Sequence, residues 1–375
     1  MISSLQLNKP RLTVLLGAGF SQSLKVPGTK EVGKAIDDAL STKFGSGYVD
    51  LRQRLKARFG KAYNFEIVAA ALEACEPYGG PGYIPGSTYL AVQPDIAELR
   101  AGLDLKFARD MYELLMFVLV QQISIDWELL APAQDVARVS DLFRTLGDDH
   151  RLDIATLNYD DIVETLVPDL NDGFEGTSDK QSFSSAKFLA DDQFPKIAHL
   201  HGSLRYGVSK AGRFEKNTGD LSPRRTPLWH PRADGSFYVG MVTGTDKPQK
   251  MILPPYSVYF MWLGQRLLTS PRMIVCGYGV GDVHVNVWLA NAARHHGGDY
   301  RMVIVDFFKE DKVPEKIRGL FAYAAGFESG VLDQSVGSSL KFVDGIATLN
   351  GAMLVRAGLP LSATQMKTVS EFIKP

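Results

Sequence analysis

The sequence predicts an α/β protein: a Rossmann-like, doubly wound parallel sheet with a mainly helical insertion. Two observations carry this prediction. Five short apolar runs lie along the chain, and each ends at its carboxyl side in Gly, Asn, Asp or His. Uninterrupted apolar runs are typical of strands that are covered on both faces of a parallel sheet. Glycines and polar residues after such strands match the edge where doubly wound sheets bind their ligands.

The apolar runs predict the strands, and apolar positions spaced by three and four residues predict the helices between them. Strands are expected at residues 12–16, 152–156, 196–200, 273–276 and 302–305. Helices are expected at residues 30–40, 65–74 and 96–123. Residues 77–86 are too rich in glycine and proline for anything but a loop.

We expect a single domain over residues 1–375, with three distinctive segments inside it. Residues 41–140 are the mainly helical insertion. Residues 205–250 hold nine Lys or Arg against four Asp or Glu, which predicts a solvated basic loop or hairpin. A patch facing nucleic acid or an anionic cofactor is the alternative. Residues 311–375 show helical stretches without recognisable chemistry, so we expect a C-terminal cap or an oligomer contact.

Composition excludes several classes of protein. The chain has 375 residues, of which 45% are hydrophobic and 22% charged, and these values exclude a disordered or collagen-like chain. The net charge of −1 provides no global basic field, so any contact with nucleic acid is expected to be indirect. Two cysteines, Cys75 and Cys276, exclude a disulfide framework and a four-cysteine zinc site within one chain.

No segment directs the chain to a membrane. Residues 1–11 are polar and lack the apolar core of an export signal. The strongest apolar run, residues 111–120, is about half of the ~20 residues that span a bilayer, so we expect a buried helix there. A cytoplasmic protein with no membrane partner is the expectation.

The first strand is followed by a glycine turn. Gly17 and Gly19 let the backbone turn sharply and approach a phosphate without a Cβ in the way. Gln22 stands where the usual dinucleotide fingerprint has its third glycine, so a purely structural turn is the alternative. Ser21 is expected either to bond a phosphate or to cap the helix that follows.

Asn158 and Asp160 follow the second strand, which ends at Thr156. An amide at this place donates and accepts at once, which suits the holding of a water or a ribose hydroxyl. Asparagine is also common in turns, so turn chemistry is the alternative for Asn158. Capping of the next helix is the alternative for Asp160 and Asp161.

Two histidines, His199 and His201, lie at the end of the third strand. Residues two apart in a strand share a face, so both imidazoles are expected to point the same way. Gly202 permits close approach beside His201, and an imidazole near neutrality can take a proton from a hydroxyl. Neither a cysteine nor a suitably spaced carboxylate joins the pair, so no metal is expected.

A second glycine-rich exit, Gly277 to Asp282, follows the fourth strand. It predicts another place where backbone meets a nucleotide. Asp306 follows the fifth strand, where an acidic side chain can accept bonds from ribose hydroxyls. Cys276 has no basic neighbour in the local sequence to activate it, and we expect core packing.

These motifs together resemble the sirtuin signature. Residues 17–21 (Gly-Ala-Gly-Phe-Ser), 156–160 (Thr-x-Asn-x-Asp) and 201–202 (His-Gly) stand in its order, and residues 277–279 resemble its later nucleotide-binding turn. The resemblance covers roughly residues 10–40 and 150–310. It implies an NAD-binding domain in which Asn158 and His201 are catalytic, with His201 as the base. The residues implied to bind NAD are Gly17, Ala18, Gly19, Phe20, Ser21, Thr156, Asp160, Gly277, Gly279, Asp282 and Asp306.

The chain departs from deacylating sirtuins in ways that affect the expected activity. Those proteins carry two Cys-x-x-Cys pairs after the catalytic histidine, whereas residues 205–250 here hold no cysteine, so no zinc is expected. Gly279 stands in place of a common serine, and residues 26–29 differ from the usual Ile-Pro-Asp-Phe-Arg stretch. The chain therefore looks like the zinc-free sirtuin-like proteins of prokaryotic antiviral defence.

That resemblance implies an NAD glycohydrolase that is activated by a partner or by oligomerisation. It implies a homo-oligomer and, for the type encoded beside one, a helicase-like ATPase partner. A zinc-free protein deacylase or ADP-ribosyltransferase is one alternative, and a non-catalytic subunit that senses NAD or ADP-ribose is another. The insertion at residues 41–140 is expected to form a lid, with the loop near Tyr83 as its mobile part.

Overall fold

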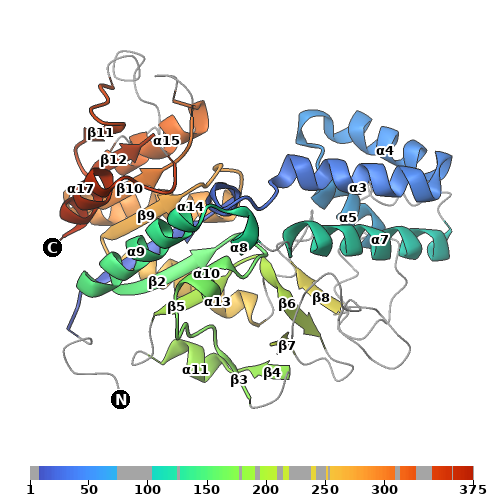
Figure 1. The fold of residues 1–375 in the computed structure, drawn as a ribbon, viewed down its shortest axis with the longest axis horizontal. Helices are drawn as coiled ribbons and strands as arrows, with labels where there is room; N and C mark the ends of the chain where they lie inside the picture. Colours follow the sequence, from blue (N-terminus) through green and yellow to red (C-terminus); the bar gives the residue numbers. More distant parts are fainter. Residues whose placement is uncertain are drawn as a thin grey trace.

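The computed structural model has a seven-stranded sheet at its centre (Figure 1). The strand order is β11-β12-β10-β9-β1-β2-β5, and all neighbours run parallel except β11 and β12. The strands are β1 (Arg11–Leu16), β2 (Arg151–Thr156), β5 (Lys196–His199), β9 (Arg272–Cys276), β10 (Arg301–Val305), β11 (Ile346–Leu349) and β12 (Ala352–Val355). The structure describes residues 8–73, 104–124, 127–176, 180–190, 195–208, 214–218, 238–241, 251, 254–308, 313–326, 340–356 and 358–374.

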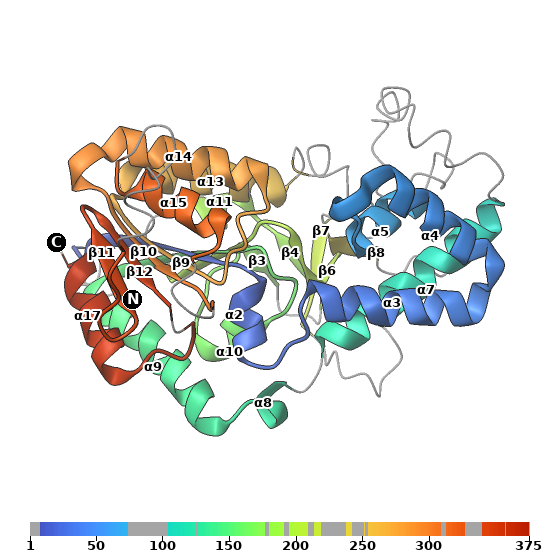
Figure 2. The ribbon, with the colours of Figure 1, turned by 90° about the horizontal axis from the view of Figure 1, so that it is seen from above.

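Helices cover both faces of this sheet (Figure 2). One layer holds α9 (Ala133–Asp149), α10 (Ile162–Leu166) and α17 (Ala363–Ile373); the other holds α13 (Tyr256–Thr269), α14 (Val283–His296) and α15 (Glu315–Ala324). Successive strand residues enter different cores: Val14 packs with the first layer and Leu15 with the second. This two-sided burial explains the uninterrupted apolar runs. The predicted fold class is confirmed.

A helical unit lies beside the sheet (Figures 1 and 2). It comprises α3 (Thr29–Phe44), α4 (Ser46–Phe59), the short turn η1 (Gly60–Ala62), α5 (Phe65–Glu73) and α7 (Leu105–Ile123). The helices predicted at residues 30–40 and 65–74 are confirmed. The third predicted helix is seen as α7, which begins after its cap, Asp104, whose carboxylate accepts from Lys106 N; residues 96–103 lie outside the described residues. The unit starts with α3 at Thr29, ahead of residue 41. The loop at residues 77–86 and its Tyr83 lie outside the described residues.

A second, antiparallel sheet was not predicted. Its order is β3-β4-β7-β6-β8, formed by β3 (Phe174–Glu175), β4 (Lys180–Phe183), β6 (Gly202–Val208), β7 (Phe214–Asn217) and β8 (Tyr238–Met241). Strands β6 and β7, which overlap the segment at residues 205–250, pair antiparallel. The remainder of that basic segment, apart from β8 and residue 218, lies outside the described residues. Leu200 and His201 alone connect β5 of the large sheet to β6 of the small one.

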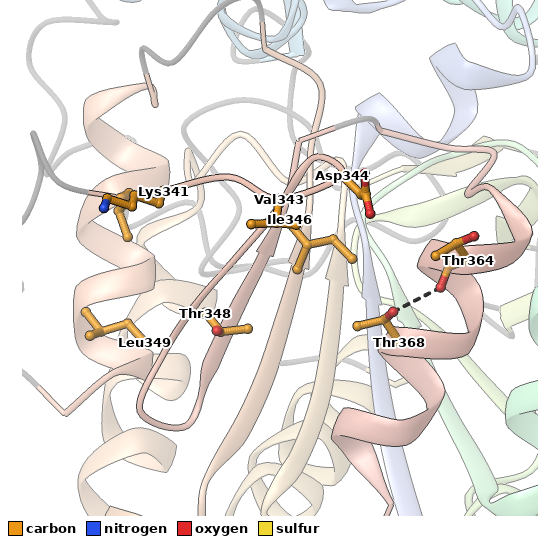
Figure 3. Close-up of a pocket in the computed structure, with 9 residues that line it drawn as sticks. Lys341, Val343, Asp344, Ile346, Thr348, Leu349, Thr364 and Thr368 are labelled. Atoms are coloured by element: carbon orange, nitrogen blue, oxygen red, sulfur yellow. Dashed lines mark hydrogen bonds between the residues drawn. The ribbon is translucent and has the colours of Figure 1, made fainter.

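Residues 311–375 contribute α15, β11, β12 and α17, and the two strands were not predicted. Helix α17 starts with a capping box between Ser362 and Gln365. A cavity of about 470 Å³ lies at this edge, between β11 and α17 (Figure 3). The sheet order places it at the opposite edge from β5, away from the predicted catalytic residues. No helix in the described part of the chain has the length and apolarity needed to cross a membrane.

Candidate functional site

The residues that follow four parallel strands of the large sheet lie together at the carboxyl ends of those strands. Leu16 pairs in register with Thr156 on one side and with Cys276 on the other. Thr156 in turn pairs with His199. The residues that follow these strands, among them Gly17, Asn158, His201 and Gly277, therefore come from neighbouring strand ends. Leu200 N donates to Thr156 O at 2.9 Å and thereby holds the third exit beside the second.

Two of these exits pack directly on one another. Gly17 N donates to Cys276 O, and Gly19 N donates to Gly277 O, both at 2.9 Å. A Cβ on Gly17 would lie 2.6 Å from Gly277 O, and one on Gly19 would lie 2.8 Å from Gly277 Cα. Gly277 itself has φ +59°. These glycines are thus required by the contact between two turns, and all three of their amides have backbone partners, since Gly277 N donates to Val305 O at 2.9 Å. A Cβ on Gly279 would meet nothing within 4 Å.

Asn158, Ser21 and Asp160 form one buried network. Asn158 Nδ2 donates to Gly17 O at 3.0 Å and to Ser21 Oγ at 2.8 Å, and Ser21 Oγ donates to Asp160 Oδ2 at 2.6 Å. The three residues are 4–7% exposed. Ser21 lies inside α2 (Ala18–Ser23), whose N-cap is Gly17, so the capping alternative for Ser21 is wrong. Its hydroxyl links the amide to the carboxylate, and its hydrogen is directed at Asp160 and not at a phosphate.

The network determines which atom of Asn158 can serve a ligand. Both hydrogens of Nδ2 are donated within the protein, to Gly17 O and Ser21 Oγ. Asn158 N donates to Thr156 Oγ1 at 3.1 Å, so Thr156 supports the turn. Asn158 Oδ1 has no hydrogen-bond partner among the described residues, and it is the atom suited to accept from a water or a hydroxyl.

The carboxylates after Asn158 have different surroundings. Burial raises the pKa of Asp160 to about 6, against the opposing effect of the Ser21 hydrogen bond. Asp160 Oδ1 also accepts from Ile162 N at 3.3 Å, at the start of α10. Asp161 occupies the N-cap position, but its side chain caps nothing and binds Arg205 Nε at 2.9 Å.

His201 is paired with a buried carboxylate from another element. Its Nε2 lies 2.8 Å from Asp282 Oδ2, and the two side chains are 7% and 6% exposed. Asp282 is the N-cap of α14, where its Oδ1 accepts from His284 N at 2.9 Å and from Val285 N at 3.2 Å. Gly202, with φ +87°, allows the turn directly after His201.

His199 binds a different acid. Its Nε2 lies 2.8 Å from Glu164 Oε1 on α10. Burial alone would lower the pKa of His199, but the charge of Glu164 raises it; the same attraction lowers the pKa of Glu164 to about 2 despite its burial. Strand β5 ends at His199, so strand alternation does not extend to His201. The two imidazoles do not share a partner, and sequence spacing did not identify Glu164.

The other predicted residues divide between site and core. Phe20 was expected near the cofactor, but its ring is 1% exposed and packs on Phe143 at a centroid distance of 6.0 Å, so it is a core residue. Ala18 is the first residue of α2. Asp306 lies at the exit of β10, where burial raises its pKa. The prediction that Cys276 packs in the core is confirmed, and burial raises the pKa of its thiol to about 12.

Within the described ranges, no three His, Cys, Asp or Glu side chains are grouped so that they could hold a metal ion. This statement covers His199, which pairs with Glu164, and His201, which pairs with Asp282.

Comparison with known proteins identifies one domain. Residues 153–324 match the family model described as a SIR2-like domain. No curated protein matches the chain significantly. Among solved structures, a Sir2 homologue mutant in complex with ADP-ribose is 15% identical, with 92% of this chain and 100% of that chain covered and a TM-score of 0.40.

Two further structures are similar. A complex of a Sir2 homologue with NAD is 14% identical, with 83% of this chain and 82% of that chain covered and a TM-score of 0.36. A Sir2 homologue mutant in complex with 2′-O-acetyl ADP-ribose is 15% identical, with 81% and 84% covered and a TM-score of 0.39.

Proposed function

We propose that this chain, which carries a SIR2-like domain over residues 153–324, hydrolyses the nicotinamide–ribose bond of NAD to give nicotinamide and ADP-ribose. One observation carries the proposal. Asn158 and His201 follow adjacent parallel strands, and each is held by its own buried partners. An oriented amide can position a water or a hydroxyl and an imidazole can take up its proton, which are two tasks in the cleavage of a glycosidic bond by water.

The residues around this pair suit a dinucleotide. Asn158 Oδ1 and the Asp306 carboxylate can accept hydrogen bonds from hydroxyls on the two riboses. Open space at Gly279 and Gly281 leaves room beside the fourth strand exit, because a Cβ at either would meet nothing within 4 Å. Gly17, Gly19 and Gly277 contribute by keeping the exits close together.

The proposed chemistry is a displacement at C1′ of the ribose. Nicotinamide leaves as a neutral ring, and the ribose acquires oxocarbenium character. Asn158 Oδ1 orients a ribose hydroxyl or the attacking water. The oxygen of that water forms the new bond to C1′, and its proton passes to His201, directly or through the ribose hydroxyl.

Release of nicotinamide and of ADP-ribose from NAD tests the proposal. The purified chain is incubated with NAD, alone and with a candidate helicase-like ATPase partner. We expect Asn158→Ala and His201→Ala each to reduce release by at least about 100-fold with the fold intact. His295→Gln is the matched control, because His295 is exposed and lies at the far end of α14. Equal turnover by His201→Ala would remove that residue from the role of base.

We also propose where this activity takes place and what activates it. A cytoplasmic protein of antiviral defence, active as a homo-oligomer or with its ATPase partner, would deplete NAD upon activation. The helical insertion would act as a lid, and the chain would form one NAD-binding domain. Nicotinamide release that depends on an acylated peptide or another acceptor would instead indicate a deacylase or an ADP-ribosyltransferase. NAD binding without release under any condition would indicate a sensing subunit.

A further inference from the structure

We propose that Asp282 is the positioning residue of His201: it orients the imidazole and determines which ring nitrogen takes up the proton. This inference rests on the proposed function and deepens it. The sequence predicted that Asp282 binds the cofactor. In the structure its Oδ2 lies 2.8 Å from His201 Nε2, and its Oδ1 accepts two backbone amides of α14. Both carboxylate oxygens therefore already have partners inside the protein.

The loop that carries Asp282 is held in place from several directions. The Tyr278 hydroxyl accepts from Asp282 N at 3.2 Å and lies 2.7 Å from Asn286 Oδ1 on α14. Asn286 Nδ2 donates to Val280 O at 3.2 Å. Val280 has φ +52°, a conformation that β-branched residues rarely adopt and that surrounding contacts must maintain. The Asp282 carboxylate is thus held in position by contacts other than the one with His201.

The pairing determines the tautomer of His201. A carboxylate accepts hydrogen bonds and donates none, so the hydrogen between the two groups belongs to His201 Nε2. In the neutral ring, Nδ1 then carries the lone pair and is the nitrogen that takes the proton from the hydroxyl or water. Asp282 keeps its charge through this step and stabilises the imidazolium, as carboxylates do for histidine bases elsewhere.

Asp282→Asn separates this role from helix capping. Asparagine caps helices about as well as aspartate, so the start of α14 is retained while the negative charge is removed. We expect kcat for nicotinamide release to fall by about 100-fold or more, with KM for NAD changed less than about threefold. The limb of the pH profile that reports protonation of the base should move to lower pH, because the imidazolium has lost its counter-charge. A residue that binds NAD would instead raise KM.

Glu164→Gln is the matched control, because it removes the other buried carboxylate that pairs with a histidine at 2.8 Å. We expect this variant to leave the position of that pH limb unchanged. If both variants shift the limb equally, or if Asp282→Asn keeps kcat within about twofold of the unsubstituted chain, Asp282 has no positioning role.

A measurement without turnover separates this inference from the proposed function. In the intact chain labelled with ¹⁵N-histidine, the His201 signals are assigned by their loss in His201→Gln. We expect neutral His201 to carry its hydrogen on Nε2 in the unsubstituted chain. Hydrogen on Nδ1 would overturn the inference. Hydrogen on Nε2 in a chain that never releases nicotinamide would sustain the positioning and refute the hydrolase.

Discussion

Asp160 is a carboxyl group of the candidate site whose burial disfavours its charged form. Its carboxyl is 6% exposed, and burial raises its pKa from 3.8 to about 6. A raised carboxyl pKa favours the folded state only while the group keeps its proton, so stability declines as the pH rises from about 4 to about 6. Near pH 7 the folded chain carries this buried charge with one neutral hydroxyl and one amide as partners. Such a cost is typical of residues retained for function.

Asp160→Asn is therefore expected to stabilise the protein while impairing it. A neutral amide removes the buried charge, and the gain near pH 7 should be on the order of 3 kcal/mol in the free energy of unfolding. Urea unfolding measured near pH 4 and near pH 7 checks this, because the gain should nearly vanish at the lower pH. Nicotinamide release should fall in the same variant. A destabilised variant near pH 7 would contradict the assigned charge.

In the His199–Glu164 pair the pKa of the carboxylate is lowered, whereas that of Asp160 is raised. The lowered pKa of Glu164 gives stability that is present above about pH 4.5 and lost as the pH falls toward 2. The raised pKa of His199 gives stability that is present below 6.5 and lost as the pH rises through its folded value. The pair thus contributes fully between those limits.

Glu164→Gln should reduce the free energy of unfolding by about 3 kcal/mol near pH 6, because it leaves a buried histidine without its counter-charge. The loss should shrink at a pH above the raised pKa of His199, where the ring is neutral in the unsubstituted chain. Chemical denaturation at the two pH values measures the difference. A loss of equal size at both would mean that the ionic pairing is absent.

At the scale of elements, the strand exits were the part that sequence could predict. Short uninterrupted apolar runs and the polar residues behind them are local signals, and they placed Gly17, Asn158 and His201 correctly at strand ends. The pairing of His201 with Asp282 was not predictable, because 81 residues separate the two and only the sheet order brings them together. The small sheet was missed because its strands, of two to seven residues, carry no sustained apolar run.

The contact between the turns that follow β1 and β9 leads to a prediction about stability. Gly19→Ala places a Cβ 2.8 Å from backbone of Gly277, so we expect a loss of about 2 kcal/mol in stability. Gly279→Ala meets no atom and should stay within about 0.5 kcal/mol of the unsubstituted chain. Thermal unfolding compares the two. If the space at Gly279 receives NAD, the second variant should also bind NAD more weakly, whereas a destabilised Gly279→Ala would show that the loop has no such space.

At the scale of the whole molecule, a hydrogen bond joins the site to the helical unit. The Tyr159 hydroxyl donates to Glu66 Oε1 on α5 at 3.2 Å, and Tyr159 directly follows Asn158. On the other side, Leu204 N of β6 donates to Tyr159 O at 2.9 Å. One residue thus contacts the helical unit and the small sheet beside the large sheet. Sequence identified the helical unit by its periodicity but gave no sign of this contact.

Tyr159→Phe tests whether the helical unit acts on the site. Removal of the hydroxyl should lower the free energy of unfolding by about 1 kcal/mol. If the unit covers bound NAD, KM for NAD should also rise several-fold while kcat changes little. Glu66→Gln keeps an acceptor at the same place and serves as the control. An unchanged KM in Tyr159→Phe would separate the helical unit from NAD binding.

If the chain is the hydrolase proposed above, the two-residue connection from β5 to β6 has a consequence for its activation. His201 belongs to that connection, so a rotation of the small sheet relative to the large one would change the position of its imidazole relative to Asn158. An activating protein need not touch the substrate at all. By binding the outer strands of the small sheet, it would change the orientation of the His201 imidazole without contacting the site.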